Sequence, residues 1–310
     1  MAPSNRAASS CRHGQLTTWR GAVAALIAAG LMGCSPQSML LKAAADQLAG
    51  QSSSAEEDLV LAREASAFYL KLSESVLAQT PGHVPLAEAV AGGFTQYAYA
   101  FVAFEAERLE TNDARAAQAL RMRAARLYGR AQRHALRALE QNNPGLGSAL
   151  AAPEALFLDR PPRLPADQVG LAYWAAAAWG AHIALSKDRP DSVADLPQAV
   201  RLARLAWEQS PDHGDGALSS LMGSFEAARP GGSTLQARAY FDRAVAAGSG
   251  RNAGPYVAMA EMLAQPAGDR EAFTSLLQQA LAASAAHPGL GNAVMRERAQ
   301  WLLDTADDRF

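Results

Sequence analysis

Apolar positions recur every three or four residues along most of the chain, which is the spacing of one face of an α-helix. The clearest run begins at Leu59 and continues to residue 78, and Pro81-Gly82 ends it. Residues 85–109 follow, with an aromatic-rich centre that is apolar all round and therefore predicts a helix buried in a core. A third helix is predicted at residues 114–140. Seven further helices follow it, at residues 167–186, 196–209, 215–228, 234–247, 254–264, 269–284 and 290–304.

Two segments interrupt this helical pattern. Residues 34–54 are predicted to be a tether, and Ser54 with Glu57 fits a capping box at the start of the first helix. Between Pro144 and Pro165 the chain is rich in proline and glycine, which predicts a long irregular connection with one short helix and a candidate internal boundary. Residues 55–310 are otherwise expected to form one all-α domain.

Paired helices of this length suggest a repeat of about 34 residues, the period of the tetratricopeptide repeat. The clearest match to the second helix of that repeat is Ala199, Ala203, Ala206 and Pro211. Partial matches are Ala237, Phe241 and Ala244; Phe273, Leu277 and Ala280; and Ala131, Ala135 and Ala138. Small side chains let helices approach closely, and a terminal proline stops each helix. Chance matches in an alanine-rich chain are the alternative, and the predicted fold class is an all-α, tetratricopeptide-like superhelix.

The first 33 residues differ from the rest of the chain. Arg6, Arg12 and Arg20 precede the apolar run 21–33, and no acidic residue occurs before Asp46. This arrangement is typical of a secretory signal peptide. The run is shorter than the roughly 20 apolar residues that span a bilayer, so a transmembrane helix is the less favoured interpretation.

The apolar run ends in LMGCS (31–35), which resembles the lipobox of bacterial lipoproteins. Lipidation requires a thiol to accept the diacylglyceryl group and a small residue before it, and Cys34 and Gly33 meet these requirements. Several acyl chains make attachment durable. The only other cysteine, Cys11, lies in the segment that would be removed. The alternative is that Cys34 is an ordinary buried side chain. Ser35 in place of aspartate favours the periplasmic face of the outer membrane over the inner membrane.

Charge and side-chain chemistry favour no enzyme. Removal of residues 1–33 changes the formal charge from −2 (28 − 30) to −5 (25 − 30). The sequence has no stripe of lysine and arginine with interleaved aromatic residues that would indicate binding to nucleic acid. No histidine pair has metal-ligand spacing, and no nucleophile elbow or phosphate-binding loop is evident, so we expect no catalytic residue, metal or cofactor. His213 and Asp215 in PDHGDG (211–216) could hold a metal or phosphate, but a helix-capping turn is the preferred interpretation.

One helix offers a candidate ligand site. Tyr173, Trp174, Trp179 and His182 place large flat apolar surfaces beside a polar ring within 167–186. Packing in the core is the alternative for these four residues.

Several blocks of the sequence resemble one family in order. They are RLYGRAQRHALRALEQNNPG (126–145), AYWAAAAWGAHIALSKDRPDSVADLP (172–197), PDHGDGALSSLMGSFEAARPGG (211–232), RNAGPYVAMAE (251–261) and DREAFTSLLQQAL (269–281). Together they resemble the T component of tripartite ATP-independent periplasmic (TRAP) transporters. The resemblance implies a periplasmic lipoprotein of tetratricopeptide-like helices, a homotrimer with a hole through each subunit, a solute-binding partner subunit, and hydrophobic or lipid-like cargo.

The leading hypothesis is therefore a non-enzymatic accessory subunit that docks a solute-binding protein and binds or passes an apolar ligand. A membrane-tethered scaffold for envelope protein assembly is the alternative, and it would present a polar groove to peptides. An envelope enzyme is the third hypothesis, and it would require His213 or His182 to cluster with carboxylates.

Overall fold

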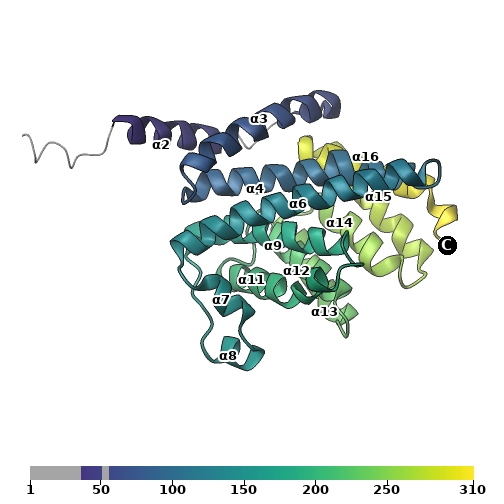
Figure 1. The fold of residues 1–310 in the computed structure, drawn as a ribbon. Helices are drawn as coiled ribbons and strands as arrows, with labels where there is room; N and C mark the ends of the chain where they lie inside the picture. The colour runs from purple at the N-terminus through teal and green to yellow at the C-terminus, as the bar shows by residue number, and fades with distance from the viewer. Residues whose placement is uncertain (1–35, 51–55) are drawn as a thin grey trace, which may run out of the picture. The chain divides into compact units, whose positions relative to one another are not determined.

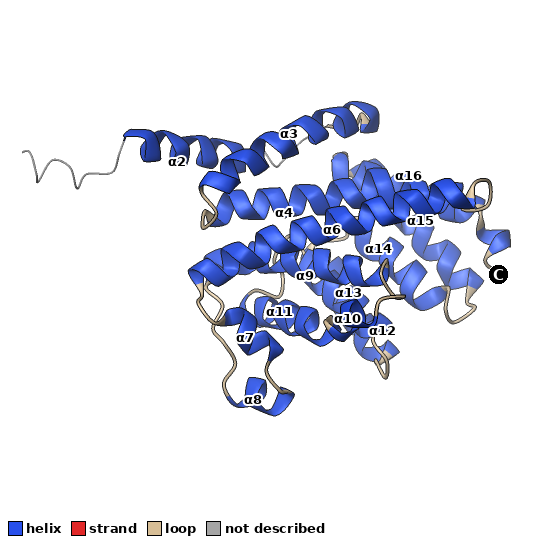
Figure 2. Ribbon diagram, in the orientation of Figure 1, coloured by secondary structure: helices blue, strands red, loops and turns tan. Residues whose placement is uncertain are grey.

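A computed structural model describes residues 36–50 and 56–310 of the chain. The signal segment, Cys34 and Ser54 lie outside the described residues. The chain divides into two units, residues 1–43 and 44–310, and the packing described below belongs to the second. The described residues contain helices and no strand (Figures 1 and 2). None of their helices combines the length and apolar character needed to cross a membrane.

The main helices closely follow the ranges expected from the sequence. They are α3 (Leu59–Gln79), α4 (Val84–Ala98), η1 (Tyr99–Ala103), α5 (Phe104–Leu109), α6 (Ala114–Asn142), α9 (Val169–Ala184), α11 (Leu196–Gln209), α12 (Ala217–Ala228), α13 (Thr234–Ala247), α14 (Gly254–Met259), η3 (Ala260–Ala264), α15 (Arg270–Ala286) and α16 (Leu290–Asp304). The π-helical turn η1 joins α4 to α5 in one continuous helix, and the π-helical turn η3 directly continues α14. The shorter elements are α2 (Pro36–Ala49), α7 (Leu146–Ala151), α8 (Glu154–Asp159), η2 (Ala166–Gln168), α10 (Pro190–Ala194) and η4 (Ala306–Asp308).

The expected capping residue of the first long helix was wrong. The N-cap of α3 is Asp58, whose carboxylate accepts hydrogen bonds from the backbone N–H groups of Val60 and Leu61. Ser54 is therefore too early in the chain to cap this helix. An aspartate directly before the first apolar residue satisfies the free N–H groups and favours the positive end of the helix dipole. The segment expected to be a tether also includes α2.

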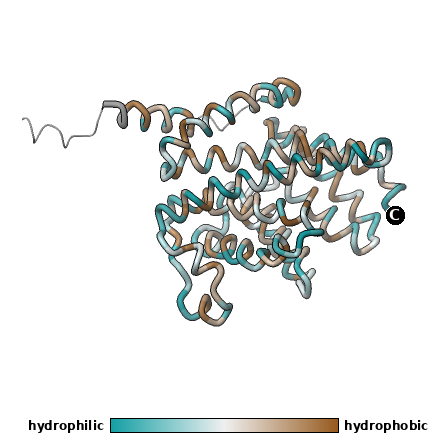
Figure 3. The backbone as a smooth tube through the Cα atoms, in the orientation of Figure 1, coloured by the Kyte–Doolittle hydropathy of each residue, from teal (hydrophilic) through white to brown (hydrophobic). Residues whose placement is uncertain are grey.

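Long helices pack on the next long helix in the chain, and α4, α9 and α12 also pack on the one after that. Contacts join α4 to α6, α6 to α9 and α9 to α11, and a second set joins α4 to α9, α9 to α12 and α12 to α14. Figure 1 shows α4 and α6 side by side, and Figure 3 shows hydrophobic and hydrophilic positions alternating along the helices. This order of contacts is that of stacked helix pairs.

Small side chains occupy the seams between the stacked helices. Three of these seams are Ala131, Ala135 and Ala138 on α6, Ala199, Ala203 and Ala206 on α11, and Ala237 and Ala244 around Phe241 on α13, all fully buried. A methyl group lets two backbones approach, and larger side chains from the facing helix fill the remaining space. The sequence positions proposed for the repeat are therefore packing positions, and their assignment to tetratricopeptide repeats stays a prediction.

The connection between α6 and α9 is packed against the helices. It contains two short helices, α7 and α8, where one was expected. Glu140 accepts hydrogen bonds from the N–H groups of Gly145 and Gly147, and Arg201 donates to the carbonyls of Leu150 and Ala152. One apolar cluster includes residues before and after this connection.

A buried ionic cluster fastens α3 to α6. Glu74 of α3 binds Arg130 and His134 of α6, the latter at 2.7 Å, and Lys71 at 2.6 Å. Burial alone raises the pKa of Glu74, but hydrogen bonds from Arg130, Lys71 and His134 lower it to about 2. The folded state therefore holds this carboxylate charged in the range where an unfolded chain already binds a proton.

We expect this cluster to give a pH-dependent part of the stability. Because the folded pKa is depressed, the contribution is complete above the ordinary pKa of about 4.5 and is lost as the pH falls toward about 2. Glu74→Gln should cost about 2 kcal/mol of unfolding free energy at pH 7. Denaturant unfolding of both proteins between pH 7 and pH 3 should show this difference shrinking, and a constant difference would contradict the assignment.

Candidate functional site

The four aromatic and histidine residues expected to contact a ligand all lie on α9. This helix packs on α4, α6, α11 and α12, so side chains on every face of it meet a neighbouring helix. Residues one apart on a helix point about 100° from each other. The structure accordingly distributes the four candidates among different partners.

Tyr173 and Trp174 lie together. Their ring centroids are 4.7 Å apart in an edge-to-face arrangement, and the ring of His213 lies 6.0 Å from that of Tyr173. Burial raises the pKa of Tyr173 to about 12 and lowers the pKa of His213, so the phenol and the imidazole are both uncharged at neutral pH. The pair and the histidine form an aromatic cluster where α9 meets the turn before α12.

A glycine on α4 makes room for the indole. A Cβ atom at Gly92 would lie 2.8 Å from Cε2 of Trp174, closer than a real side chain can approach. The indole of Trp174 therefore lies directly on the backbone of α4. Glycine in a helix interior costs about 1 kcal/mol relative to alanine, and here it permits this close contact.

A carboxylate lies one turn away on the same pair of helices. Glu88 of α4 extends over Gly170 of α9, where an added Cβ would lie 2.2 Å from Oε1. The side chain is partly buried, and burial raises its pKa. We call Glu88, Tyr173, Trp174 and His213 the α4–α9 cluster.

Trp179 has a different environment. It is buried and contributes to an open pocket between α6, α7 and α11. The other apolar residues of that pocket are Leu136, Leu146 and Leu150, and Arg137, Glu140 and Gln198 are polar members. Trp179 is therefore mainly a core residue with one face available to this pocket.

His182 joins α9 to α6. Its Nδ1 atom lies 2.8 Å from the carbonyl oxygen of Ala125, and Gly129 provides the space beside the ring. This contact fixes the packing of two helices. His182 therefore contributes to helix packing and does not belong to the α4–α9 cluster.

The PDHGDG segment forms a tight turn between α11 and α12. Asp215 has a φ of 53°, Gly214 and Gly216 have φ of 64° and 92°, and the side chain of Asn252 donates to the carbonyl of Asp215. Within the described part of the chain, no three metal-binding side chains come together. The turn leads into α12, whose N-cap Gly216 forms no side-chain capping hydrogen bond, and His213 contributes its ring to the aromatic cluster.

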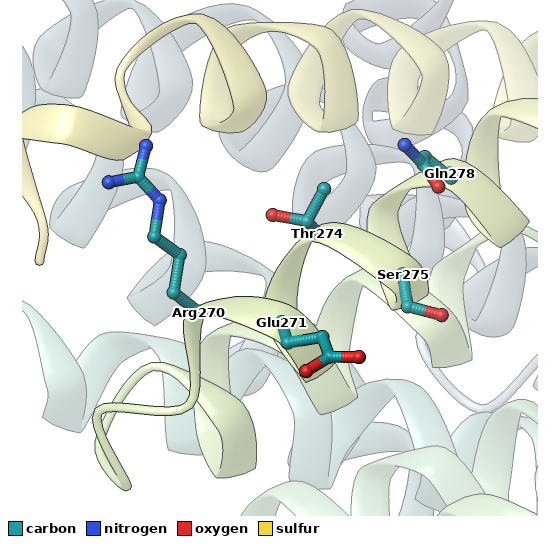
Figure 4. Close-up of a pocket in the computed structure, with 5 residues that line it drawn as sticks. All are labelled: Arg270, Glu271, Thr274, Ser275 and Gln278. Carbon is teal, nitrogen blue, oxygen red and sulfur yellow. The ribbon is translucent and has the colours of Figure 1, made fainter.

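A second pocket lies on the surface of α15. Arg270, Glu271, Thr274, Ser275 and Gln278 line it, and all five come from the same helix (Figure 4). Arg270 forms an ion pair with Asp307. This pocket is a polar, solvated helix face.

The molecule is a stack of helix pairs in which one face carries a half-buried aromatic and carboxylate cluster. The family profile described as TRAP transporter T-component matches residues 55–310. The chain belongs to this family, whose role is that of an accessory subunit of a TRAP transport system.

A relative agrees with this extent. An uncharacterized protein of Treponema pallidum (strain Nichols) is 29% identical over 265 residues, which cover 82% of this chain and 81% of that protein.

We expect Gly92→Ala to be destabilising in spite of its better helix propensity. The new methyl group must displace the indole of Trp174, and overpacking of this kind costs about 1–3 kcal/mol. Denaturant unfolding measures the change.

Gly291→Ala is the matched control for this substitution. Gly291 lies exposed in α16, and an added Cβ meets nothing within 4 Å. We expect no loss of stability there, because only the gain in helix propensity remains. Equal effects at both positions would show that Trp174 does not rest on Gly92.

Proposed function

We propose that this chain is a periplasmic, lipid-anchored accessory subunit of a TRAP-type transport system. It docks the periplasmic solute-binding subunit, binds or passes a hydrophobic small molecule or lipid, and carries out no chemical step. The observation that carries the ligand part is the α4–α9 cluster, where Tyr173 and Trp174 offer flat apolar surfaces that are only partly covered.

Family membership supports the transport context. A T component works beside other transporter subunits, so the chain needs surfaces for partners as well as an interior for cargo. The resemblance in sequence extends through all the helices of the domain. We propose no catalytic role for any residue of the α4–α9 cluster.

An exposed apolar stripe on α3 supports assembly. Leu61, Ala65, Phe68 and Leu72 are all exposed, and Phe68 retains 76% of its accessible surface. Their successive spacings of four, three and four residues are those of helix-to-helix packing. We assign this stripe to contacts between copies of the chain in a homotrimer.

The anchor supports the proposed location. Cys34 lies outside the described residues, and its lipobox context in the sequence is the basis for placing the protein at the periplasmic face of the outer membrane. Acyl chains at this cysteine hold the domain at the membrane without a spanning helix.

Mass spectrometry of the full chain, produced in a Gram-negative host and extracted in mild detergent, tests this proposal. The denatured mass should begin at Cys34 with acyl groups added. The native mass should correspond to three copies, with a bound apolar compound that organic solvent removes. Trp174→Ala should lower the amount of that compound severalfold, whereas Leu235→Ala, at a side chain that is 82% exposed, should not.

Two results would contradict the proposal. An intact leader without acyl groups would exclude the anchor. A bound peptide in place of an apolar compound, or no ligand together with no association to a solute-binding protein, would favour the envelope scaffold.

A further inference from the structure

The carboxylate of Glu88 differs from two other carboxylates that are buried or partly buried in the domain, those of Glu74 and Glu261. Glu74 binds Arg130, and Glu261 binds Arg298 through two hydrogen bonds. Within residues 36–50 and 56–310, Glu88 forms no hydrogen bond or ion pair. A charged group that loses water without a partner raises the free energy of the folded protein, so natural proteins seldom retain one without use.

Among the residues that the structure describes, no positively charged side chain lies near enough to Glu88 to pair with its carboxylate. Burial is the only cause of its raised pKa, so no neighbouring cation acts on the carboxylate. His213, the basic residue of the same cluster, has a pKa lowered by burial and is uncharged at neutral pH. The α4–α9 cluster therefore contains one carboxylate and no positive charge to pair with it.

The aromatic rings stand beside this carboxylate. Glu88 lies over Gly170, and Trp174 lies over Gly92. On α4, Glu88 is four residues before Gly92, and on α9, Gly170 is four residues before Trp174. Four helical residues advance about 6 Å along the axis, so the two contacts follow one another at about one helical turn along the α4–α9 interface. Tyr173, edge-to-face with Trp174, extends the aromatic surface.

A carboxylate next to half-buried aromatic rings suits one kind of chemical group. An alkylammonium head is attracted by the carboxylate charge and by the electron-rich ring faces, and an aliphatic chain covers the remaining apolar surface. An anionic head would be repelled by the ionised form of Glu88, and a neutral head would give this carboxylate no counter-ion.

We propose that the α4–α9 cluster binds the cationic amine head of an amphiphile, with Glu88 as its counter-ion and Trp174 and Tyr173 as its aromatic contacts. This inference rests on the proposed function, since it specifies the class of apolar ligand that the subunit carries.

Three twelve-carbon probes test the assignment: dodecylamine, dodecanol and dodecanoate. The protein is the mature chain with Cys34→Ser, which keeps every described residue and needs no detergent. Binding is measured by displacement of a fluorescent apolar dye. Dodecylamine should bind about tenfold more tightly than the other two probes, a difference of about 1.4 kcal/mol.

Glu88→Gln should remove this preference. The affinity for dodecylamine should fall about tenfold, while that for dodecanol stays within about twofold, which also shows that the variant remains folded. Glu64→Gln, at an exposed carboxylate on α3, is the matched control and should leave all three affinities unchanged.

The outcomes separate this inference from the proposed function. Equal binding of the three probes, or an equal loss of all three in Glu88→Gln, would overturn the amine site and leave an apolar carrier intact. Binding of no probe would contradict both.

Discussion

The guanidinium of Arg298 joins the last long helix to the first helical layer. Arg298 lies on α16, is only 6% exposed, and binds Glu261 of η3 at 2.6 and 2.9 Å and Glu107 of α5 at 2.9 Å. Residues 107 and 298 are 191 positions apart in the chain. Contacts within each helix pair cannot set this distance, because each pair fixes only its neighbours. This ionic clasp, together with the contacts between α16 and α3, therefore joins the end of the stack to its beginning.

Aromatic rings complete the clasp. The rings of Phe104 and Tyr99 lie 5.3 and 5.5 Å from the guanidinium carbon, and Phe104 also packs edge-to-face on Trp301 at 5.4 Å. Two π-helical turns, η1 and η3, supply Tyr99 and Glu261 to it. A π turn inserts one residue and rotates the following face of the helix by about 100°, and such turns are frequent at functional sites. The same α4–η1–α5 helix presents Glu88 and Gly92, so the clasp and the α4–α9 cluster share one rigid element.

The sequence was sufficient for most of the helices because their apolar spacing, capping residues and Pro-Gly breaks agree with one another. The ranges 196–209, 234–247 and 290–304 coincide with α11, α13 and α16. Periodicity could not reveal η1 and η3, since an inserted residue changes the face of a helix without ending it. The capping box at Ser54 and Glu57 failed because Asp58, directly before the first apolar residue, caps the helix, and local spacing does not decide between the two possible N-caps.

The candidate site was only partly predictable. Tyr173 and Trp174 were found from their size and position, but the glycine on which Trp174 packs lies on α4, about 80 residues earlier in the chain. A signal for this contact was present, because Gly92 and Gly170 weaken otherwise strong helices and indicate close approach of another element. Which glycine receives which side chain depends on the register between helices, and a single sequence does not contain it. Glu88 was missed for the same reason.

Amide hydrogen exchange of wild type and Arg298→Leu, followed by mass spectrometry of peptides, tests the clasp most directly, with the exposed Arg270→Leu as control. The account predicts that α16 and η1–α5 lose protection together, on the order of a hundredfold, while α11 retains its protection. Unchanged protection of α16, or an equal loss along the whole domain, would contradict it.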